Sequence, residues 1–261
     1  MITAGIDVGA KNVRVVILED GEVIGKAMIE AGFETDKSCD ECLKKALEDA
    51  GIERKDIRYI ISTGSGRKAV DWANEESTEI IVNARGIYNL DPACRICIDV
   101  GAEEARAVKI GRDGKVDDFV VNEKCAAGAG VFVETIARAL EVSLGEFANL
   151  GLKSDRIIPM NAQCVVFAES EVVSLIHSGY SKEDISKAVH NAMAERIASM
   201  VKGIGLSEKI YLVGGVALNP SFKKALEENL NKAVYIPEKI HPQFIGAYGA
   251  AILAAERVSY G

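Results

Sequence analysis

The chain has 261 residues, of which 48% are hydrophobic and 27% charged, and its formal net charge is −8 at pH 7. This composition is typical of a globular protein of one or two domains, and no apolar run approaches the roughly 20 residues that a membrane-spanning helix needs. The acidic balance excludes nucleic acid as the expected main partner, because neutralising phosphates requires clustered lysine and arginine.

The first predicted element is a strand, ITAGIDVG, that follows Met1 directly, without the basic and apolar regions of a secretory signal. We therefore expect a cytoplasmic protein with neither a membrane nor nucleic acid as a partner. In that reducing compartment the six cysteines are expected to be thiols, metal ligands or core residues rather than disulfides.

The pentapeptide IDVGA occurs at residues 6–10 and again at residues 98–102. The similarity continues in IDVGAKNVRVVILEDGEV and IDVGAEEARAVKIGRDGKV, which align residue for residue until the second copy gains one residue. Each copy predicts a strand, a tight glycine turn, a second strand and a hairpin that leads to a third strand. The hairpin turns are expected at Asp20–Gly21 and Asp113–Gly114. We interpret the pattern as an internal duplication.

Helices follow the strands in both halves. The stretch DECLKKALEDAG predicts a helix that ends at Gly51, before the strand IRYIISTG. In the second half, helices are expected near residues 131–140, 170–177 and 182–204, before the strand KIYLVGGV and a final helix, GAYGAAILAAERV. This order predicts an α/β protein of two related domains with a cleft between them. We place the first lobe at residues 1–92, with the C-terminal helix a candidate to pack back on it, and the second at residues 93–261.

The aspartate and the glycine of each repeat can contribute to the same kind of binding site. Asp7 lies near the end of an apolar strand, and Gly9 permits a turn whose backbone N–H groups face outward. Such a turn can cradle phosphate oxygens, and a nearby carboxylate becomes favourable when Mg²⁺ bridges it to the phosphate. Asp99 and Gly101 repeat the arrangement. A single Asp-x-Gly is often an ordinary turn, but its duplication favours two opposed hairpins that grip one triphosphate.

A third element, YLVGGVALN at residues 211–219, is an apolar strand that ends in a glycine pair suited to a base and ribose. The three elements in this order resemble the nucleotide-binding fold shared by actin, the heat-shock 70 chaperones and the sugar and acetate kinases. The resemblance implies ATP as the ligand, Asp7 and Asp99 as groups that hold Mg²⁺ or orient water, and Gly214–Gly215 as part of the adenosine pocket. It also implies phosphate contacts from Gly9, Ala10, Lys11, Gly101 and Ala102.

Two stretches, NEKCAAGAGVFVETIARAL and NAQCVVFAESEVVSLI, each place one cysteine at or just before a predicted helix start. A helix N-terminus stabilises a thiolate and offsets the negative charge of a thiolate-ligated iron–sulfur cluster. Two cysteines cannot ligate a [4Fe–4S] cluster, whereas a symmetric dimer that supplies Cys125 and Cys164 from each subunit can. The alternative is that both are small core residues, which is the commoner fate of free cysteine.

The pattern CAAGAG followed by CVVFAESEV, with STGSGR at residues 62–67 and the C-terminal PQFIGAYGAAILA, closely resembles the BadF/BadG/BcrA/BcrD family. This family comprises activator ATPases of 2-hydroxyacyl-CoA dehydratases and ATP-hydrolysing subunits of benzoyl-CoA reductase. The resemblance implies a dimer with one [4Fe–4S] cluster, shared between subunits at their interface, that couples ATP hydrolysis to delivery of a low-potential electron. It implies Cys125 and Cys164 as cluster ligands and Gln243 on the adenosine side. The implied first phosphate loop is Ala10, Lys11, Asn12, Val13 and Arg14.

One motif departs from the family pattern. The activators usually carry Gly-Gly-Gln-Asp in the second phosphate hairpin, whereas this chain has GAEEAR, with Ala102 and Glu103 in place of the second glycine and the glutamine. If that glutamine positions the attacking water, hydrolysis here is slower or uses Glu103 as the catalytic group. The altered hairpin, with ARGIYNLDPACRICIDVGA, looks more like an ATPase subunit of benzoyl-CoA reductase. That subtype leaves both a homodimer and a heterodimer with a related ATPase subunit open.

The resemblance also implies partners. The implied electron acceptor is an acyl-CoA dehydratase or reductase component, and the implied electron source is ferredoxin or flavodoxin.

A rival hypothesis is a small-molecule kinase of the same fold that acts on a sugar or a carboxylate. Another is a regulatory nucleotide-binding module without redox chemistry. A kinase needs a base beside the γ-phosphate and has no use for interfacial cysteines.

The four other cysteines form two Cys-x-x-Cys pairs, Cys39/Cys42 and Cys94/Cys97, which raise a zinc or second-cluster hypothesis. The second pair flanks or enters the strand RICIDV, where residues three apart point to opposite faces, so chelation there is disfavoured. The first pair lies at a helix start, and a metal there is the less favoured interpretation. The scattered histidines are interpreted as ordinary surface or partly buried residues: His177, His190 and His241.

Overall fold

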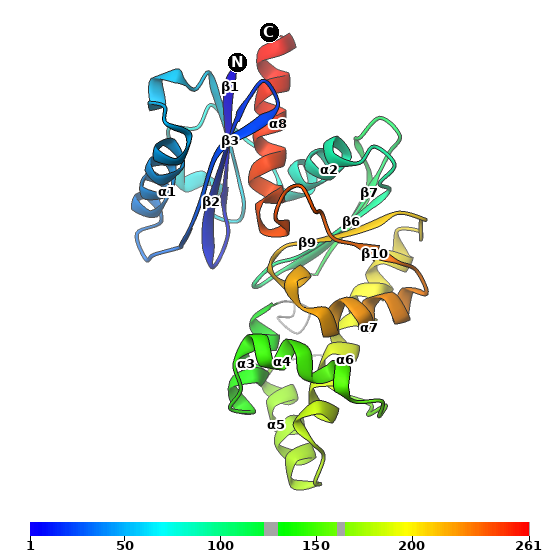
Figure 1. Cartoon of the computed structure of the whole chain (residues 1–261). Coiled ribbons are helices and arrows are strands. Elements are labelled where there is room, and N and C mark those ends of the chain that lie inside the picture. Colours follow the sequence, from blue (N-terminus) through cyan, green and yellow to red (C-terminus); the bar gives the residue numbers. More distant parts are fainter. Residues whose placement is uncertain (123–129, 161–164, 261) are drawn as a thin grey trace. The chain divides into compact units, whose positions relative to one another are not determined.

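The computed structural model describes residues 1–122, 130–160 and 165–260 (Figure 1). Two five-stranded sheets organise the described chain. It divides into two compact units, the first made of residues 1–97, 110–117 and 237–261 and the second of residues 98–109 and 118–236. Within the described ranges, no helix has both the length and the apolar character needed to span a bilayer.

The first sheet has the strand order β3-β2-β1-β4-β5. Its central strand β1 is antiparallel to β2 and parallel to β4, while β3 closes the hairpin beside β2. Asp20 and Gly21 both have positive φ, 50° and 91°, as a two-residue hairpin turn requires, so this predicted turn is confirmed. The strands are β1 Ile2–Val8, β2 Asn12–Glu19, β3 Glu22–Glu30, β4 Tyr59–Thr63 and β5 Glu75–Glu76.

Helices cover both faces of this sheet. Strand β2 shows why: Val13, Val15 and Ile17 pack into one cluster with helix α1 (Thr35–Ala50), whereas Val16 and Leu18 pack with helix α8 (Ile245–Tyr260) on the other face. Because successive residues of a strand point to opposite faces, a strand buried on both sides is apolar almost throughout. Helix α1 ends as predicted, with Gly51 in the left-handed conformation at φ 67°.

Helix α8 lies close to both β1 and helix α2 (Glu79–Leu90) because three glycines remove the side chains in between. A Cβ on Gly5 of β1 would lie 2.0 Å from the Ala247 carbonyl oxygen. A Cβ on Gly249 of α8 would lie 1.8 Å from the Val82 carbonyl oxygen, and Gly86 of α2 faces Gly249. Figure 1 shows the red C-terminal helix beside the blue first strand. The final predicted helix therefore completes the first unit.

The second sheet repeats the order of the first. Its order β10-β9-β6-β7-β8, read from the other edge, matches β3-β2-β1-β4-β5 when β6 takes the place of β1. The duplication detected in one hairpin therefore extends to all five strands of each sheet. The strands are β6 Ile96–Val100, β7 Ala105–Ile110, β8 Val116–Asn122, β9 Ile210–Val213 and β10 Val234–Tyr235.

The helices of the second unit agree with the three predicted segments and add two more. Helix α6 begins with a capping box in which the Ser181 and Asp184 side chains bond to each other's backbone N–H. Helix α7 begins with Asn219 as its N-cap and Pro220 in its first turn. Helices α2, α4 and α7 were not predicted from the sequence. The helices are α3 Gly130–Ala139, α4 Leu144–Leu150, α5 Val165–His177, α6 Lys182–Gly203 and α7 Pro220–Leu230. Short 3-10 helices are η1 Arg54–Asp56, η2 Arg67–Ala69, η4 Gly151–Lys153, η5 Gly215–Leu218 and η6 Pro242–Phe244.

We expect Gly249→Ala to destabilise the protein by about 1–3 kcal/mol or more, since the new methyl group has to push the backbones of α2 and α8 apart. The matched control is Gly145→Ala in α4, where a Cβ meets no described atom within 4 Å. That change is expected to stabilise the protein by roughly 0.5–1 kcal/mol through its helix propensity. Urea unfolding followed by circular dichroism measures both, and equal midpoints would contradict the close α2–α8 contact.

Candidate functional site

A pair of opposite charges lies across the first repeat hairpin. Asp7, near the end of β1, stands opposite Arg14 of β2 in the strand register. The Arg14 Nη1 atom donates to Asp7 Oδ2 over 3.2 Å, and the two side chains are only 13% and 14% exposed. Between them the chain reverses at Gly9, whose N–H donates to the Asn12 carbonyl oxygen over 3.0 Å. The hairpin therefore presents a partly buried carboxylate beside a tight backbone turn.

The second repeat hairpin has the same arrangement. The Arg106 Nη1 atom donates to Asp99 Oδ2 over 3.3 Å, and these side chains are 11% and 14% exposed. Gly101 N–H donates to the Glu104 carbonyl oxygen over 2.9 Å, which repeats the turn of the first hairpin. Arg106 also pairs with the Glu104 carboxylate through Nη2. The tertiary structure thus reproduces the sequence duplication in the side-chain contacts.

Each aspartate has a glycine from a neighbouring strand beside it. Gly64 follows β4 with φ 93°, and a Cβ there would lie 2.4 Å from the Val8 carbonyl oxygen and 2.7 Å from Asp7 Oδ1. Gly214 follows β9 with φ 86°, and a Cβ there would lie 2.4 Å from the Val100 carbonyl oxygen and 2.7 Å from Asp99 Oδ1. Glycine is needed at both positions for two reasons: the backbone has a positive φ, and a side chain would occupy the space of the carboxylate.

We call Asp7, Gly9, Arg14 and Gly64 the first half-site. We call Asp99, Gly101, Arg106 and Gly214 the second half-site. Each combines hard carboxylate oxygens, which suit Mg²⁺, with a tight turn at a glycine. Because the glycine has no side chain, a phosphate can approach the backbone of the turn. The residues present therefore fit a magnesium-bound polyphosphate. In addition, a Cβ on Gly246 would lie 3.0 Å from Asp7 Oδ2, so the start of α8 also leaves room for this carboxylate.

The remaining predicted phosphate residues lie on the same two hairpins. Ala10 and Lys11 are exposed at the first turn, and Asn12 is half-buried. The Val13 side chain is buried in the core of the first unit, so only its backbone is available to a ligand. In the second hairpin Ala102 is half-buried and Glu103 is exposed. This turn is held by α3, because the N–H groups of Gly130 and Val131 donate to the carbonyl oxygens of residues 101 and 102.

The predicted adenosine residues belong to two different units. Gly214 and Gly215 connect β9 to η5 in the second unit, and Gln243 is half-buried in η6 of the first. A joint role for them stays a prediction. Arg106, Gly64 and Gly246 were not predicted as site residues. An arginine seven residues after the aspartate in both repeat copies was the available signal for Arg106.

Cys125 and Cys164, the predicted cluster ligands, lie outside the described residues. The side chains of the other four cysteines are fully buried. Burial raises the pKa of Cys39 to about 11 and that of Cys42 to about 12, so both are protonated at neutral pH. Cys42 also donates to the Val13 carbonyl oxygen over 3.3 Å. Among the described residues, no three His, Cys, Asp or Glu side chains are grouped so as to hold a metal ion.

The interpretation of the histidines is wrong for one of the three. His177 ends α5 and His241 precedes η6, and both are exposed. His190 is only 1% exposed, in the middle of α6. His190 is buried because it lies on the side of α6 that packs against the rest of the unit. The positions of the histidines in the sequence do not predict which side that is.

Two sheets of matching strand order, each with an aspartate–glycine hairpin, define an α/β nucleotide-binding protein of the actin-like ATPase class. Solved structures with this fold include a sugar kinase, the hexokinase of the ROK type from Thermus thermophilus, with a TM-score of 0.57. That protein is 14% identical over 100% of both chains, so the likeness shows the fold alone.

The model of the BadF/BadG/BcrA/BcrD ATPase family matches residues 4–254, and the chain belongs to this family. The chain is 37% identical to the activator of lactoyl-CoA dehydratase from Anaerotignum propionicum, over 98% of both chains. It is 31% identical to one of the subunits of benzoyl-CoA reductase from Thauera aromatica, over 98% of this chain and 94% of that one.

Two solved structures are similar over nearly the whole chain. The (R)-2-hydroxyglutaryl-CoA dehydratase component A from Acidaminococcus fermentans has a TM-score of 0.94 and 32% identity, over 99% of both chains. The activator of 2-hydroxyisocaproyl-CoA dehydratase from Clostridium difficile, solved with bound ADPNP, has a TM-score of 0.92 and 33% identity, over 100% of this chain and 96% of that one. The predicted family, fold and ATP-binding activity are therefore confirmed.

We expect Gly64→Ala and Gly214→Ala to weaken nucleotide binding about tenfold or more, because each new methyl group displaces the neighbouring aspartate. Gly51→Ala is the matched control, since Gly51 has φ 67° but a Cβ there has no atom of the described residues within 4 Å. All three variants carry the strain of a positive φ, on the order of 1 kcal/mol. Titration with a fluorescent ATP analogue separates the two effects, and equal affinities in the three variants would contradict the crowding argument.

Proposed function

We propose that this ATPase hydrolyses Mg-ATP at its two half-sites and uses the reaction to deliver a low-potential electron to an acyl-CoA dehydratase or reductase component. The observation that carries the proposal is the repetition of one aspartate–arginine–glycine arrangement at the same strand positions of two sheets. Internal duplication explains why the ion pair occurs twice, and a shared function explains why both copies keep the glycine turn beside the carboxylate. Binding the phosphates of one substrate at two sites is such a function.

The residues take separate roles in this proposal. Asp7 and Asp99 hold Mg²⁺ directly or through its water, and the turns at Gly9 and Gly101 approach the phosphates through their backbone. Bound Mg²⁺ supplies positive charge that neutralises the phosphate oxygens. Arg14 and Arg106 hold the aspartates in place through the hydrogen bonds described above. Glu103, exposed on the second turn, is the candidate to orient the attacking water.

The electron-transfer part of the proposal depends on Cys125 and Cys164. We propose that a dimer of this chain, or of this chain with a related ATPase subunit, holds one [4Fe–4S] cluster through these two cysteines of each subunit. Helix α5 begins at Val165, the residue after Cys164, and the positive end of a helix dipole favours an anionic cluster. Ferredoxin or flavodoxin is the proposed electron source.

The names of the relatives support the acceptor class. The relatives of this chain include activators of 2-hydroxyacyl-CoA dehydratases and a benzoyl-CoA reductase subunit, and both kinds serve enzymes of CoA thioesters. The kinase alternative has less support, because the sugar kinases share 12–14% identity and therefore only the fold.

Replacing Asp7 or Asp99 with asparagine should lower the rate of Mg-ATP hydrolysis on the order of 100-fold while the protein stays folded, because each change removes a charge needed for the metal or its water. Asp118→Asn is the control, an exposed aspartate on β8 of the second repeat. Phosphate release measured at saturating Mg²⁺ gives the rates. Wild-type hydrolysis in both half-site variants would rule out the proposed role of the repeat.

Cys125→Ser and Cys164→Ser should each abolish the cluster, because serine lacks the soft thiolate that iron prefers. The same change at the four buried cysteines should leave the cluster in place, although it can reduce stability because a hydroxyl replaces a core thiol. Iron and sulfide analysis after anaerobic purification, with visible absorbance, counts the clusters, and sedimentation of the same samples reports the dimer. A colourless wild-type protein after reconstitution with iron and sulfide would overturn the redox proposal.

A further inference from the structure

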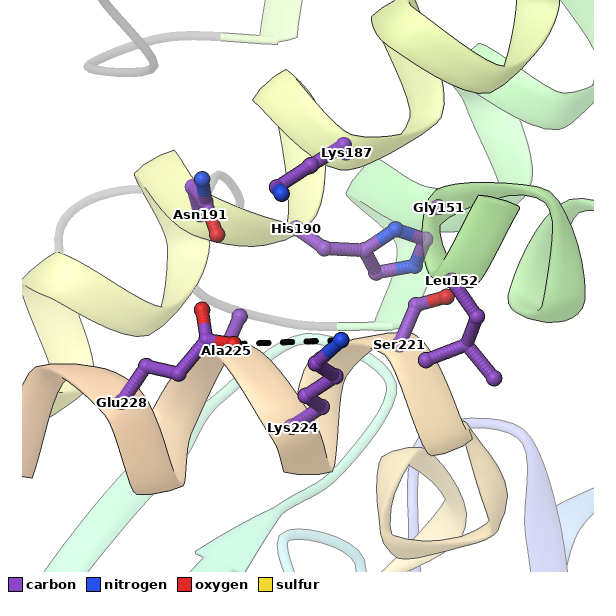
Figure 2. Close-up of a pocket in the computed structure, with 9 residues that line it drawn as sticks. All are labelled: Gly151, Leu152, Lys187, His190, Asn191, Ser221, Lys224, Ala225 and Glu228. Carbon is purple, nitrogen blue, oxygen red and sulfur yellow. Dashed lines mark ion pairs between the residues drawn. The ribbon is translucent and has the colours of Figure 1, made fainter. Parts of the chain in front are cut away.

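The buried His190 of α6 joins three elements of the second unit. Its ring centroid lies 5.0 Å from that of Phe147 in α4, and its ring nitrogens contact Ser186 of α6 and Asn219 before α7. In Figure 2 its ring lies at a small pocket, together with Gly151 of η4 and Ser221 of α7. The nucleotide-binding proposal above assigns no role to this residue.

The hydrogen bonds of His190 fix its tautomer. Its Nδ1 atom lies 2.7 Å from the Ser186 carbonyl oxygen, and a carbonyl can only accept, so Nδ1 carries the hydrogen. Burial lowers the pKa of His190 to about 4, so the ring is neutral at pH 7. Its Nε2 atom is then a bare acceptor.

Asn219 is oriented by two hydrogen bonds. Its Nδ2 atom donates to His190 Nε2 over 2.8 Å, while its Oδ1 atom accepts from Phe222 N–H over 3.0 Å and so caps α7. A rotated amide would turn a donor toward the Phe222 N–H and an acceptor toward the bare Nε2. The neutral imidazole therefore selects the one amide orientation in which Asn219 caps the helix.

The same network reaches α4. Ser186 Oγ donates to the Phe147 carbonyl oxygen over 2.9 Å and also lies 3.3 Å from His190 Nδ1. All members of this chain of contacts are buried. Residues 214–219, which we call the adenosine loop, end at Asn219 and begin at the glycine beside Asp99. The C-terminal end of this loop is thus tied through His190 to α6 and α4.

We propose that His190 is a positioning residue for nucleotide: through Asn219 it holds the adenosine loop in the shape that binds the adenosine of ATP. The proposal rests on the ATP-binding function proposed above and on the sequence-based prediction that Gly214 and Gly215 line the adenosine pocket. His190 acts through Asn219 and takes no part in the chemical step. The loss of His190 is therefore expected to weaken chiefly the binding of adenosine-containing ligands, because Asn219 lies at the opposite end of the loop from Gly214, the loop residue that belongs to the second half-site.

Two substitutions of the same residue separate the two ring nitrogens. His190→Asn keeps a donor near the Nδ1 position but is too short to reach Asn219, whereas His190→Gln can place its amide oxygen near the Nε2 position. We expect His190→Asn to raise the KM for ATP about tenfold with kcat within about twofold, since a buried donor of Asn219 loses its acceptor. We expect His190→Gln to restore a KM close to that of the wild type.

The pocket supplies a packing control. Ser221 lines it beside His190 (Figure 2). Its side chain is 4% exposed, and its hydroxyl has no hydrogen-bond partner among the described residues. Ser221→Ala should therefore leave KM and kcat unchanged. If His190→Asn does not fold, Asn219→Ser replaces it, because a serine still caps α7 but has no amide to donate to His190. The same rise in KM is expected from that variant.

Calorimetric titration with ADP and with inorganic tripolyphosphate, each with Mg²⁺, completes the test. His190→Asn should bind ADP about tenfold more weakly than the wild type and tripolyphosphate equally well. An unchanged KM and ADP affinity in His190→Asn, with only a lower melting temperature, would overturn the inference and leave a structural role. Equal losses for ADP and tripolyphosphate would overturn it as well. If the wild-type protein binds no adenine nucleotide, the proposed function itself is wrong.

Discussion

The ion pair between an aspartate at the end of a central strand and an arginine on the neighbouring strand constrains most of the structure. A partly buried carboxylate is costly without a hydrogen-bonded countercharge, and an arginine directly opposite in the hairpin supplies one. The carboxylate also needs space. Gly64 and Gly214 provide it where the neighbouring strand ends, and both have the positive φ that favours glycine. Together they form one structural motif, made of the hairpin, its neighbouring strand and that turn, and this motif occurs twice.

The packing of helices on both faces of the sheet stabilises this motif. Strand β2 contributes apolar residues to both faces, so its sheet requires a helical layer on each side. Helix α1 directly follows the hairpin and covers one face, but the other face is covered by α8, from the far end of the sequence. Gly5, Gly86 and Gly249 allow α8 to lie almost in backbone contact with β1 and α2. The start of the same helix passes beside Asp7, so the packing of the first unit and the geometry of its half-site are coupled.

The two half-sites are not chemically equal. Arg106 is shared between Asp99 and Glu104, so the second half-site carries one carboxylate more than the first. In the part of the chain that the structure describes, the buried Arg14 Nε atom has no hydrogen-bond partner, and Gly246 lies against Asp7 in the first half-site. The second is continued into the adenosine loop by Gly214, where His190 and Asn219 fix the loop's far end. Duplication thus supplied two similar carboxylate sites, and their neighbours make them different.

The amino-acid sequence was enough to predict the repeated hairpins, the turn at Asp20–Gly21, the helix that ends at Gly51 and, by resemblance, the family, because each is recorded in residues close together along the chain. Helices α2, α4 and α7 were missed, although Asn219 and Pro220 form a recognisable helix start. Only the tertiary structure placed Gly64 and Gly246 beside Asp7 and buried His190 between α4 and α7. These contacts join residues far apart in sequence, and which face of a helix becomes buried depends on what packs against it rather than on local pattern.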